Sequence, residues 1–183
     1  TYFAVSSYSS WSVHFGWELG EWAVWLVPAL FSTAIASAFL VTVTVTYMLI
    51  PEANERGDNI DHYFRWDSQL MHNGNIIFIL TEMAVSDISL SLWYAPYPVI
   101  FGCIYVLFSA FNARRSGIYF YDFIDPRLDG SHIIHMVLLG VMLIHFILAF
   151  TIQGLAELSF TGHVLTLVVI SYLATTFSNH SKK

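Results

Sequence analysis

Charged side chains are scarce in this chain of 183 residues. They make up 11% of the sequence, and 56% of the residues are hydrophobic. Ordinary globular chains carry roughly a quarter charged residues. The charged residues here are too few to cover a water-soluble globule of this size. The composition therefore argues against a soluble domain and predicts that lipid surrounds most of the chain.

Cysteine and basic residues are also few. The single cysteine, Cys103, excludes an internal disulfide bond. Seven basic residues stand against thirteen acidic ones, which gives a net charge of −6. The basic residues form no patch rich enough to hold a phosphate backbone. Nucleic acid is therefore excluded as a partner.

Five long apolar runs predict an all-α, polytopic membrane helix bundle. A helix needs about 20 mainly apolar residues to cross a hydrocarbon core roughly 30 Å thick. Only helices and closed barrels satisfy the backbone in lipid, and a barrel would show alternating segments of about ten residues. We predict a single transmembrane domain over residues 1–183, with helices at about 22–50, 68–92, 97–113, 130–156 and 158–181.

The basic residues fall on one side of this predicted topology. With five crossings, one face of the membrane receives segments 51–67 and 114–129 and the C-terminus, which together carry all seven Lys and Arg residues. Loops that stay on the cytosolic side carry an excess of Lys and Arg. We therefore predict that these loops and the C-terminus face the cytosol, or the matrix or stroma of an organelle.

Several ionisable side chains lie inside the predicted helices, where each costs roughly 2.5–3.5 kcal/mol on insertion scales and needs a partner or a role. They are His72, Glu82, Asp87, His145 and His163. Asn75 and Glu82 are almost two full turns apart and His72 lies one turn earlier, so we expect one shared face that points into the bundle. Glu82 and His145 both fall near mid-membrane, where a direct pair would satisfy both.

Histidines also gather near the start of the fourth predicted helix. His132 and His135 share a side at spacing i, i+3, and His72 begins its helix at the same depth. No carboxylate-bearing metal motif surrounds them, so we predict no metal site. Pairs among His72, His135 and His145 can ligate a haem or a chlorophyll, but no spacing rule selects them and no cofactor is predicted. The simplest alternative is that the acids and histidines hydrogen-bond one another between helices.

Several segments, read in order, match a known pattern. His72-Asn-Gly-Asn75 precedes the acid Glu82, and Tyr97-Pro-Val-Ile-Phe-Gly and Gly117-Ile-Tyr-Phe-Tyr-Asp-Phe-Ile-Asp-Pro126 follow. This order resembles the Rolling stone family, with its His-Gly-x-Asn helix start, Tyr-Pro helix and Ile-Tyr…Leu-Asp…Pro loop. It is similar, more distantly, to the androgen-induced-gene family of membrane hydrolases, which cleave fatty acid esters of hydroxy fatty acids. The resemblance covers roughly residues 22–150.

The hydrolase resemblance implies a Thr nucleophile with a His partner. His72 matches that His by position, and Asn75 or Glu82 would orient it. A hydroxyl needs such a base within hydrogen-bond reach. The Thr-bearing helix of the hydrolases, however, precedes the segment that matches 25–51. The threonines at 33, 42, 44 and 46 therefore lie on the wrong helix.

We therefore predict a non-catalytic, multi-pass membrane protein. Its partners would be the lipid bilayer and other membrane protein subunits, among which it would be an accessory or structural subunit. One alternative is a lipid-ester hydrolase that uses His72. A second is a membrane subunit that ligates haem or chlorophyll through the same histidines.

Overall fold

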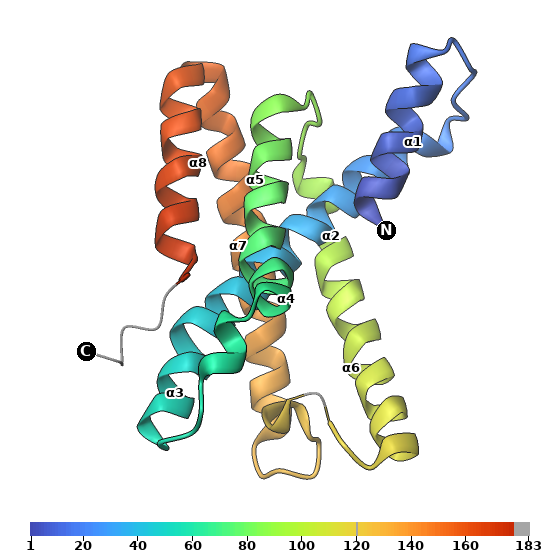
Figure 1. Ribbon diagram of the computed structural model, residues 1–183. Helices are drawn as coiled ribbons and strands as arrows, with labels where there is room; N and C mark the ends of the chain where they lie inside the picture. The colour runs from blue at the N-terminus through green and yellow to red at the C-terminus, as the bar shows by residue number, and fades with distance from the viewer. Residues whose placement is uncertain (120, 178–183) are drawn as a thin grey trace.

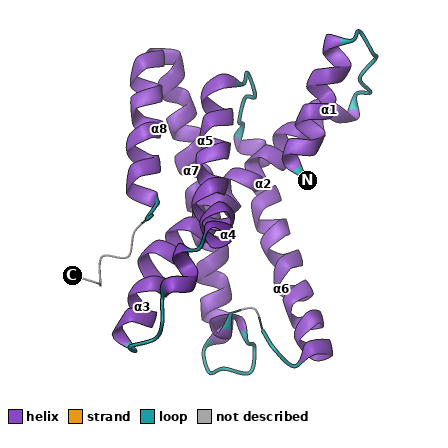
Figure 2. Cartoon of the chain, viewed as in Figure 1, coloured by secondary structure: helices purple, strands orange, loops and turns teal. Residues whose placement is uncertain are grey.

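The computed structural model describes residues 1–119 and 121–177, and this part of the chain is helical with no strand (Figure 2). The predicted all-α class is confirmed. The α-helices are α1 Tyr2–His14, α2 Trp22–Thr44, α3 Ile50–Glu55, α4 Trp66–Gln69, α5 Asn75–Val85, α6 Pro96–Ser116, α7 Ser131–Leu158 and α8 Phe160–Ala174. Two π-helical turns, η1 Val45–Leu49 and η3 Leu70–Gly74, join α2 to α3 and α4 to α5. The 3-10 turns are η2 Asp61–Phe64, η4 Leu92–Tyr94 and η5 Asp122–Ile124.

The central helix of the bundle is α2, which packs against α1, α5, α6, α7 and α8 and runs obliquely across the others (Figure 1). Its buried face alternates small side chains with Phe31, Ile35 and Phe39. Small residues let neighbouring helices approach closely, which is how helices associate in lipid. Ile76 from α5 and Phe146 from α7 are fully buried against this face and complete the core.

Three helical segments are long and apolar enough to cross a membrane: 22–55, 92–116 and 131–156. The chain is therefore a multi-pass helical membrane protein. The apolar helix α8 has 15 residues, or about 22 Å at 1.5 Å per residue, which is shorter than the hydrocarbon core. The helix of residues 66–85 carries polar side chains along its length. That α8 and the helix of residues 66–85 also cross the membrane stays a prediction.

The first predicted helix continues beyond residue 50. We expected Pro51 to end it, but α2, η1 and α3 run without a break to Glu55. Proline normally disrupts a helix because it lacks an N–H and its ring clashes with a carbonyl of the preceding turn. Here the π turn η1 ends at Leu49, so the turn before Pro51 is wider than an α turn and makes room for the ring.

The second predicted helix ends early. It runs from Trp66 to Val85 rather than 68–92, and Ser86 is already extended. The side chain of Gln153 on α7 explains why the extended segment 86–91 is stable. Its amide donates to the carbonyl of Ile88, and its oxygen accepts from the N–H of Leu90 at 2.6 Å. Gln153 thus replaces hydrogen bonds that a helix would have supplied.

The other boundaries shift by smaller amounts. The third helix, α6, is longer than the predicted 97–113 and continues to Ser116. The next residue, Gly117, has a left-handed backbone (φ 77°) that terminates the helix. The fourth, α7, lies close to the predicted 130–156. The fifth, α8, ends at Ala174, and residues 178–181 of its predicted range lie outside the described residues. Sequence analysis did not predict α1.

The connections that carry the arginines gather at one end of the bundle. The segment between α3 and α4 and the segment between α6 and α7 both lie at the lower end in Figure 1, whereas the α1–α2 loop and the α7–α8 turn lie at the upper end. The described arginines lie within or beside the two lower connections, at 56, 65, 114, 115 and 127. This arrangement fits the predicted clustering of positive charge. That this end of the bundle faces the cytosol, matrix or stroma stays a prediction.

Candidate functional site

Asn73, rather than Asn75, faces inward from the second predicted helix. It lies three and seven residues before the buried Ile76 and Leu80, so it shares their face of the helix. Asn75 is exposed and donates to the carbonyl of Met71 on its own helix. Asn73 is instead 3% exposed. The expected inward face of Asn75 with Glu82 is therefore wrong, because Asn73 takes the inward position.

Asn73 and three other side chains cap the C-terminal end of α8. The amide of Asn73 donates to the carbonyl of Thr176 at 2.6 Å and to Gln69 Oε1 at 2.7 Å, and Gln69 Nε2 also donates to Thr176. Thr46 donates to the carbonyl of Ala174, and Tyr47 to that of Leu173. The last carbonyls of a helix have no intrahelical partner. Side chains from η1, α4 and η3 supply those partners, and we call Thr46, Tyr47, Gln69 and Asn73 the α8 cap.

The candidate base His72 lies against Thr42 of α2. The Thr42 hydroxyl is fully buried and donates to the backbone carbonyl of His72 at 2.6 Å. The ring Nδ1 of His72 is buried and has no hydrogen-bond partner among the described residues. A threonine and the candidate histidine therefore meet, although Thr42 lies on the wrong helix for the nucleophile that the hydrolase resemblance implies. The hydroxyl proton, however, is bound to the carbonyl and not to the ring.

The acid Glu82 is engaged by α1. Its Oε1 accepts from the phenol of Tyr2 at 2.8 Å and from the hydroxyl of Ser6 at 3.2 Å. Burial raises the pKa of the Tyr2 phenol, and the nearby carboxylate raises it further. The expected pair of Glu82 with His145 is wrong. His145 stacks on Phe39 instead, with ring centroids 5.5 Å apart, and its Nδ1 is buried without a partner among the described residues.

The remaining histidines mostly bind backbone. His135 Nε2 lies 3.2 Å from the carbonyl of Ile124, and His163 Nδ1 lies 3.0 Å from the carbonyl of Ile152. His163 is 2% exposed and joins α8 to α7, whereas His132 is exposed. Among residues 1–119 and 121–177, no three His, Cys, Asp or Glu side chains come together as a metal ion would need. Of the three histidines considered for a haem or chlorophyll, His72 and His145 each have a buried Nδ1 without a partner in the described part of the chain.

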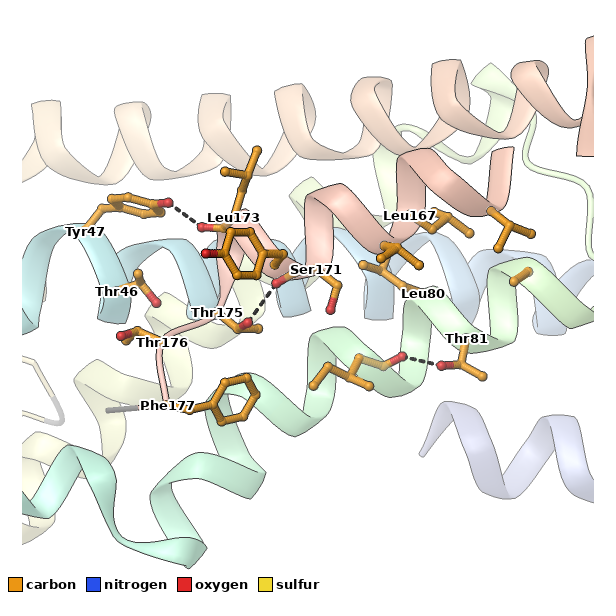
Figure 3. A pocket seen from close by; sticks show the side chains of 15 residues that line it. Thr46, Tyr47, Leu80, Thr81, Leu167, Ser171, Leu173, Thr175, Thr176 and Phe177 are labelled. Carbon is orange, nitrogen blue, oxygen red and sulfur yellow. Dashed lines mark hydrogen bonds between the residues drawn. The ribbon is translucent and has the colours of Figure 1, made fainter. Parts of the chain in front are cut away.

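Among the cavities between the described helices are three with volumes of about 300 to 900 Å³. The first, about 900 Å³, is a groove between the end of α2, α5 and α8, beside the α8 cap (Figure 3). The second, about 300 Å³, lies between α2, α6 and α7. The third, about 450 Å³, separates α1 from the end of α5 and is lined by serines together with Glu82 and Asp87. His72 lines none of these three cavities.

Comparisons of the chain with models of protein families, with curated proteins and with solved structures find no match. The resemblance to the Rolling stone family therefore stays a prediction. The contacts and cavities of the chain itself carry the functional inference.

Proposed function

We propose that the chain is a non-catalytic, multi-pass membrane protein that acts as an accessory or structural subunit of a larger membrane assembly. One observation carries the proposal: polar groups at the expected catalytic site are engaged by backbone carbonyls or by hydroxyls of α1 instead. Thr42 donates to a carbonyl, Glu82 accepts from two hydroxyls of α1, and Asn75 bonds its own helix. A hydroxyl nucleophile needs a base that accepts its proton, and Thr42 has none in this arrangement.

An exposed aromatic cluster at the upper end of the bundle supports contact with a partner. Trp11 stacks on Phe15 with centroids 5.4 Å apart, and Phe15 stacks on Trp17 at 5.5 Å. All three rings are more than half exposed. Aromatic residues are enriched in protein interfaces. The helix α1 is itself held to the bundle by Tyr2 and Ser6, so the cluster is presented on a fixed support.

Isolation from native membranes tests this proposal. We expect the tagged chain, extracted in mild detergent, to migrate on native gels with other subunits in a fixed ratio. Substitution of Trp11, Phe15 and Trp17 by Ser should release it, whereas Trp93→Ser, which removes an exposed ring outside the cluster, should not. Migration of the folded wild-type chain without partner subunits would contradict the proposal.

A second candidate, a lipid-ester hydrolase that uses His72, is favoured by the position of Thr42. A rotation of the Thr42 hydroxyl away from the His72 carbonyl would free its proton for a base, and the His72 ring has an unpartnered nitrogen. The test is turnover of a fatty acid ester of a hydroxy fatty acid by the purified chain. This candidate requires that Thr42→Val and His72→Ala abolish turnover. Thr33→Val is the control, because Thr33 bonds only the carbonyl of Ala29 on its own helix. No turnover by folded protein removes this candidate.

A further inference from the structure

The cavity between α2, α6 and α7 has the size of a ligand site. Its volume of about 300 Å³ is at the lower end of the range of small-molecule sites, roughly 300–1,000 Å³. Protein interiors are close-packed and hold few voids larger than a water molecule. A space of this size between three membrane-crossing helices is therefore expected to be filled, and the surrounding solvent that can fill it is lipid. We call it the α2–α6–α7 cavity.

The wall of the α2–α6–α7 cavity is apolar and uncharged. Aliphatic and aromatic side chains form most of it, and among the described side chains that line it there is no Asp, Glu, Lys, Arg or His. The polar side chains in the wall are the hydroxyls of Ser37, Thr44, Tyr105 and Tyr121. Burying a charged headgroup against this wall would be costly without an opposite charge to pair it. The lining therefore selects an apolar chain whose polar group is neutral.

Two features of the hydroxyls point to a bound polar group. The Ser37 hydroxyl is buried and has no hydrogen-bond partner among the described residues, although buried polar atoms nearly always have one. Tyr105 comes from α6 and Tyr121 from the connection between α6 and α7, yet both line this cavity. Burial raises the pKa of the Tyr121 phenol, so that it remains a hydrogen-bond donor.

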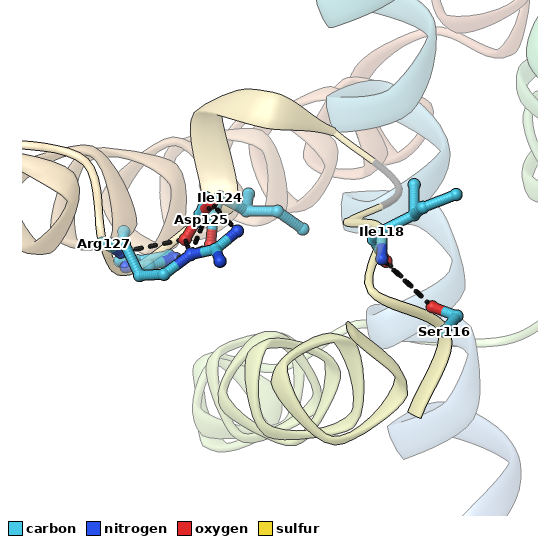
Figure 4. A network of polar contacts seen from close by, with 6 residues as sticks. Ser116, Ile118, Ile124, Asp125 and Arg127 are labelled. Atoms are coloured by element: carbon cyan, nitrogen blue, oxygen red, sulfur yellow. Dashed lines mark hydrogen bonds and ion pairs between the residues drawn. The ribbon is translucent and has the colours of Figure 1, made fainter. Parts of the chain in front are cut away.

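The end of the cavity formed by residues 121–124 is held in place by contacts outside the cavity. The ring of His135 bonds the carbonyl of Ile124, and the side chain of Arg127 makes hydrogen bonds of 2.6–3.0 Å to both carboxylate oxygens of Asp125 (Figure 4). At the other end of this connection, the Ser116 hydroxyl bonds Ile118. These contacts hold the end of the cavity formed by residues 121–124, which we call its floor, and they use none of the hydroxyls of the cavity.

We propose that the α2–α6–α7 cavity binds the hydrocarbon chain of a neutral lipid whose one polar group is a hydroxyl, such as a long-chain alcohol. The chain lies between α2 and α6, and its hydroxyl meets the phenols of Tyr105 and Tyr121 at the floor. The volume holds one chain rather than the two chains of a phospholipid. This site goes beyond the accessory role, because it gives the subunit a specific lipid, and it does not depend on that role.

Photolabelling of the full chain in phosphatidylcholine nanodiscs tests the site. The probes are a hexadecanol that carries a diazirine and an alkyne, and the matching carboxylic acid and phosphocholine. We expect the alcohol to label peptides that contain residues 101–106 and 121–124, and unlabelled hexadecanol to compete. The acid and the phosphocholine should label only the outer face of α6, which includes Leu107, 71% exposed.

Two neighbouring residues supply a matched pair of variants. Val106 lines the cavity, and Val106→Phe should lower labelling by the alcohol roughly tenfold or more because it fills the space. Leu107→Phe makes a similar change on the outer face and should leave labelling unchanged. Equal labelling of the two variants, or labelling of the cavity peptides by the acid as strongly as by the alcohol, would overturn the proposal.

A smaller change covers the case in which Val106→Phe does not fold. Tyr121→Phe removes one hydroxyl and keeps the ring, so the thermal midpoint without probe should stay the same. Loss of one hydrogen bond of about 1 kcal/mol should lower labelling by the alcohol roughly fivefold. Unchanged labelling of folded Tyr121→Phe would overturn the assignment of the polar group to this end of the cavity, and the proposal with it.

Discussion

The side-chain amide of Asn73 lies 2.6 Å from the carbonyl oxygen of Thr176, and the two residues are 103 positions apart in the chain. This bond joins the π turn in the second long helical segment to the chain directly after the last described helix. Gln69 donates to the same carbonyl at 3.2 Å, so two amides hold the chain beyond α8. Asn73 is thus the best-placed single residue at which to break the α8 cap.

Removal of the Asn73 amide should destabilise the bundle. We expect Asn73→Ala to lower the free energy of unfolding by about 1–3 kcal/mol, because it removes the shorter of the two hydrogen bonds to the Thr176 carbonyl and the donor to Gln69 Oε1. Denaturation by sodium dodecyl sulfate in mixed micelles measures the change. Asn75→Ala is the control, since Asn75 is exposed two residues away, and it should shift stability by less than about 0.5 kcal/mol. Equal losses in both variants would contradict the inward placement of Asn73.

The Gln153 side chain should be essential for the extended segment 86–91. Gln153→Leu removes both of its hydrogen bonds to Ile88 and Leu90, so we expect a loss of about 2–3 kcal/mol. Amide hydrogen exchange at 86–91 should become faster. Thr151→Val is the control, because Thr151 bonds only the carbonyl of Ile147 on its own helix. Unchanged exchange in Gln153→Leu would show that another group holds the segment.

Alkaline pH should detach α1 from the bundle. The docked Tyr2 has a raised pKa, so above pH 10 the detached helix loses the phenol proton, whereas the docked helix keeps it. The docked state then binds more protons, and its stability must fall as pH rises. We expect docking to be independent of this phenol below about pH 9 and to weaken progressively above pH 10. Accessibility of α1 to a protease across this range measures it.

Two phenol variants separate this titration from a general effect of base. Tyr2→Phe should dock more weakly at neutral pH and lose the alkaline dependence. Tyr8→Phe should behave as wild type, because Tyr8 is 54% exposed and makes no hydrogen bond to Glu82. An alkaline transition that persists in Tyr2→Phe would assign it to another group.

Single-cysteine labelling should place the arginine-rich connections together. Cys103 is the only cysteine, so Cys103→Ala gives a background without thiols. We expect Asn59→Cys and Asp129→Cys to react with an impermeant maleimide from the same side of a sealed vesicle, and Glu18→Cys from the other, as the charge bias requires. Reaction of Asn59→Cys and Asp129→Cys from opposite sides would contradict the topology.

Sequence patterns predicted the apolar helices well and the polar contacts poorly. Long apolar runs and the arginine bias are properties of composition, so the starts of α2 and α7 were close to their predicted positions. Asn75 was placed inward because it shares a face with Glu82, whereas the apolar face of Ile76 and Leu80 includes Asn73. The helix α1 mixes serines with aromatic residues and has no apolar stripe. Its bond to Glu82 was therefore missed, and His145 was given as the partner instead.

The bond between Gln153 and the 86–91 segment also constrains the order in which the chain is assembled. A ribosome releases Ile88 and Leu90 more than sixty residues before Gln153, so their backbone groups have no protein partner when they first enter the translocon. Water or the channel wall must satisfy them until α7 arrives. Biogenesis of the bundle is therefore completed only after the second half of the chain is made, and nascent chains that stop before α7 should be recognised by membrane quality control and degraded.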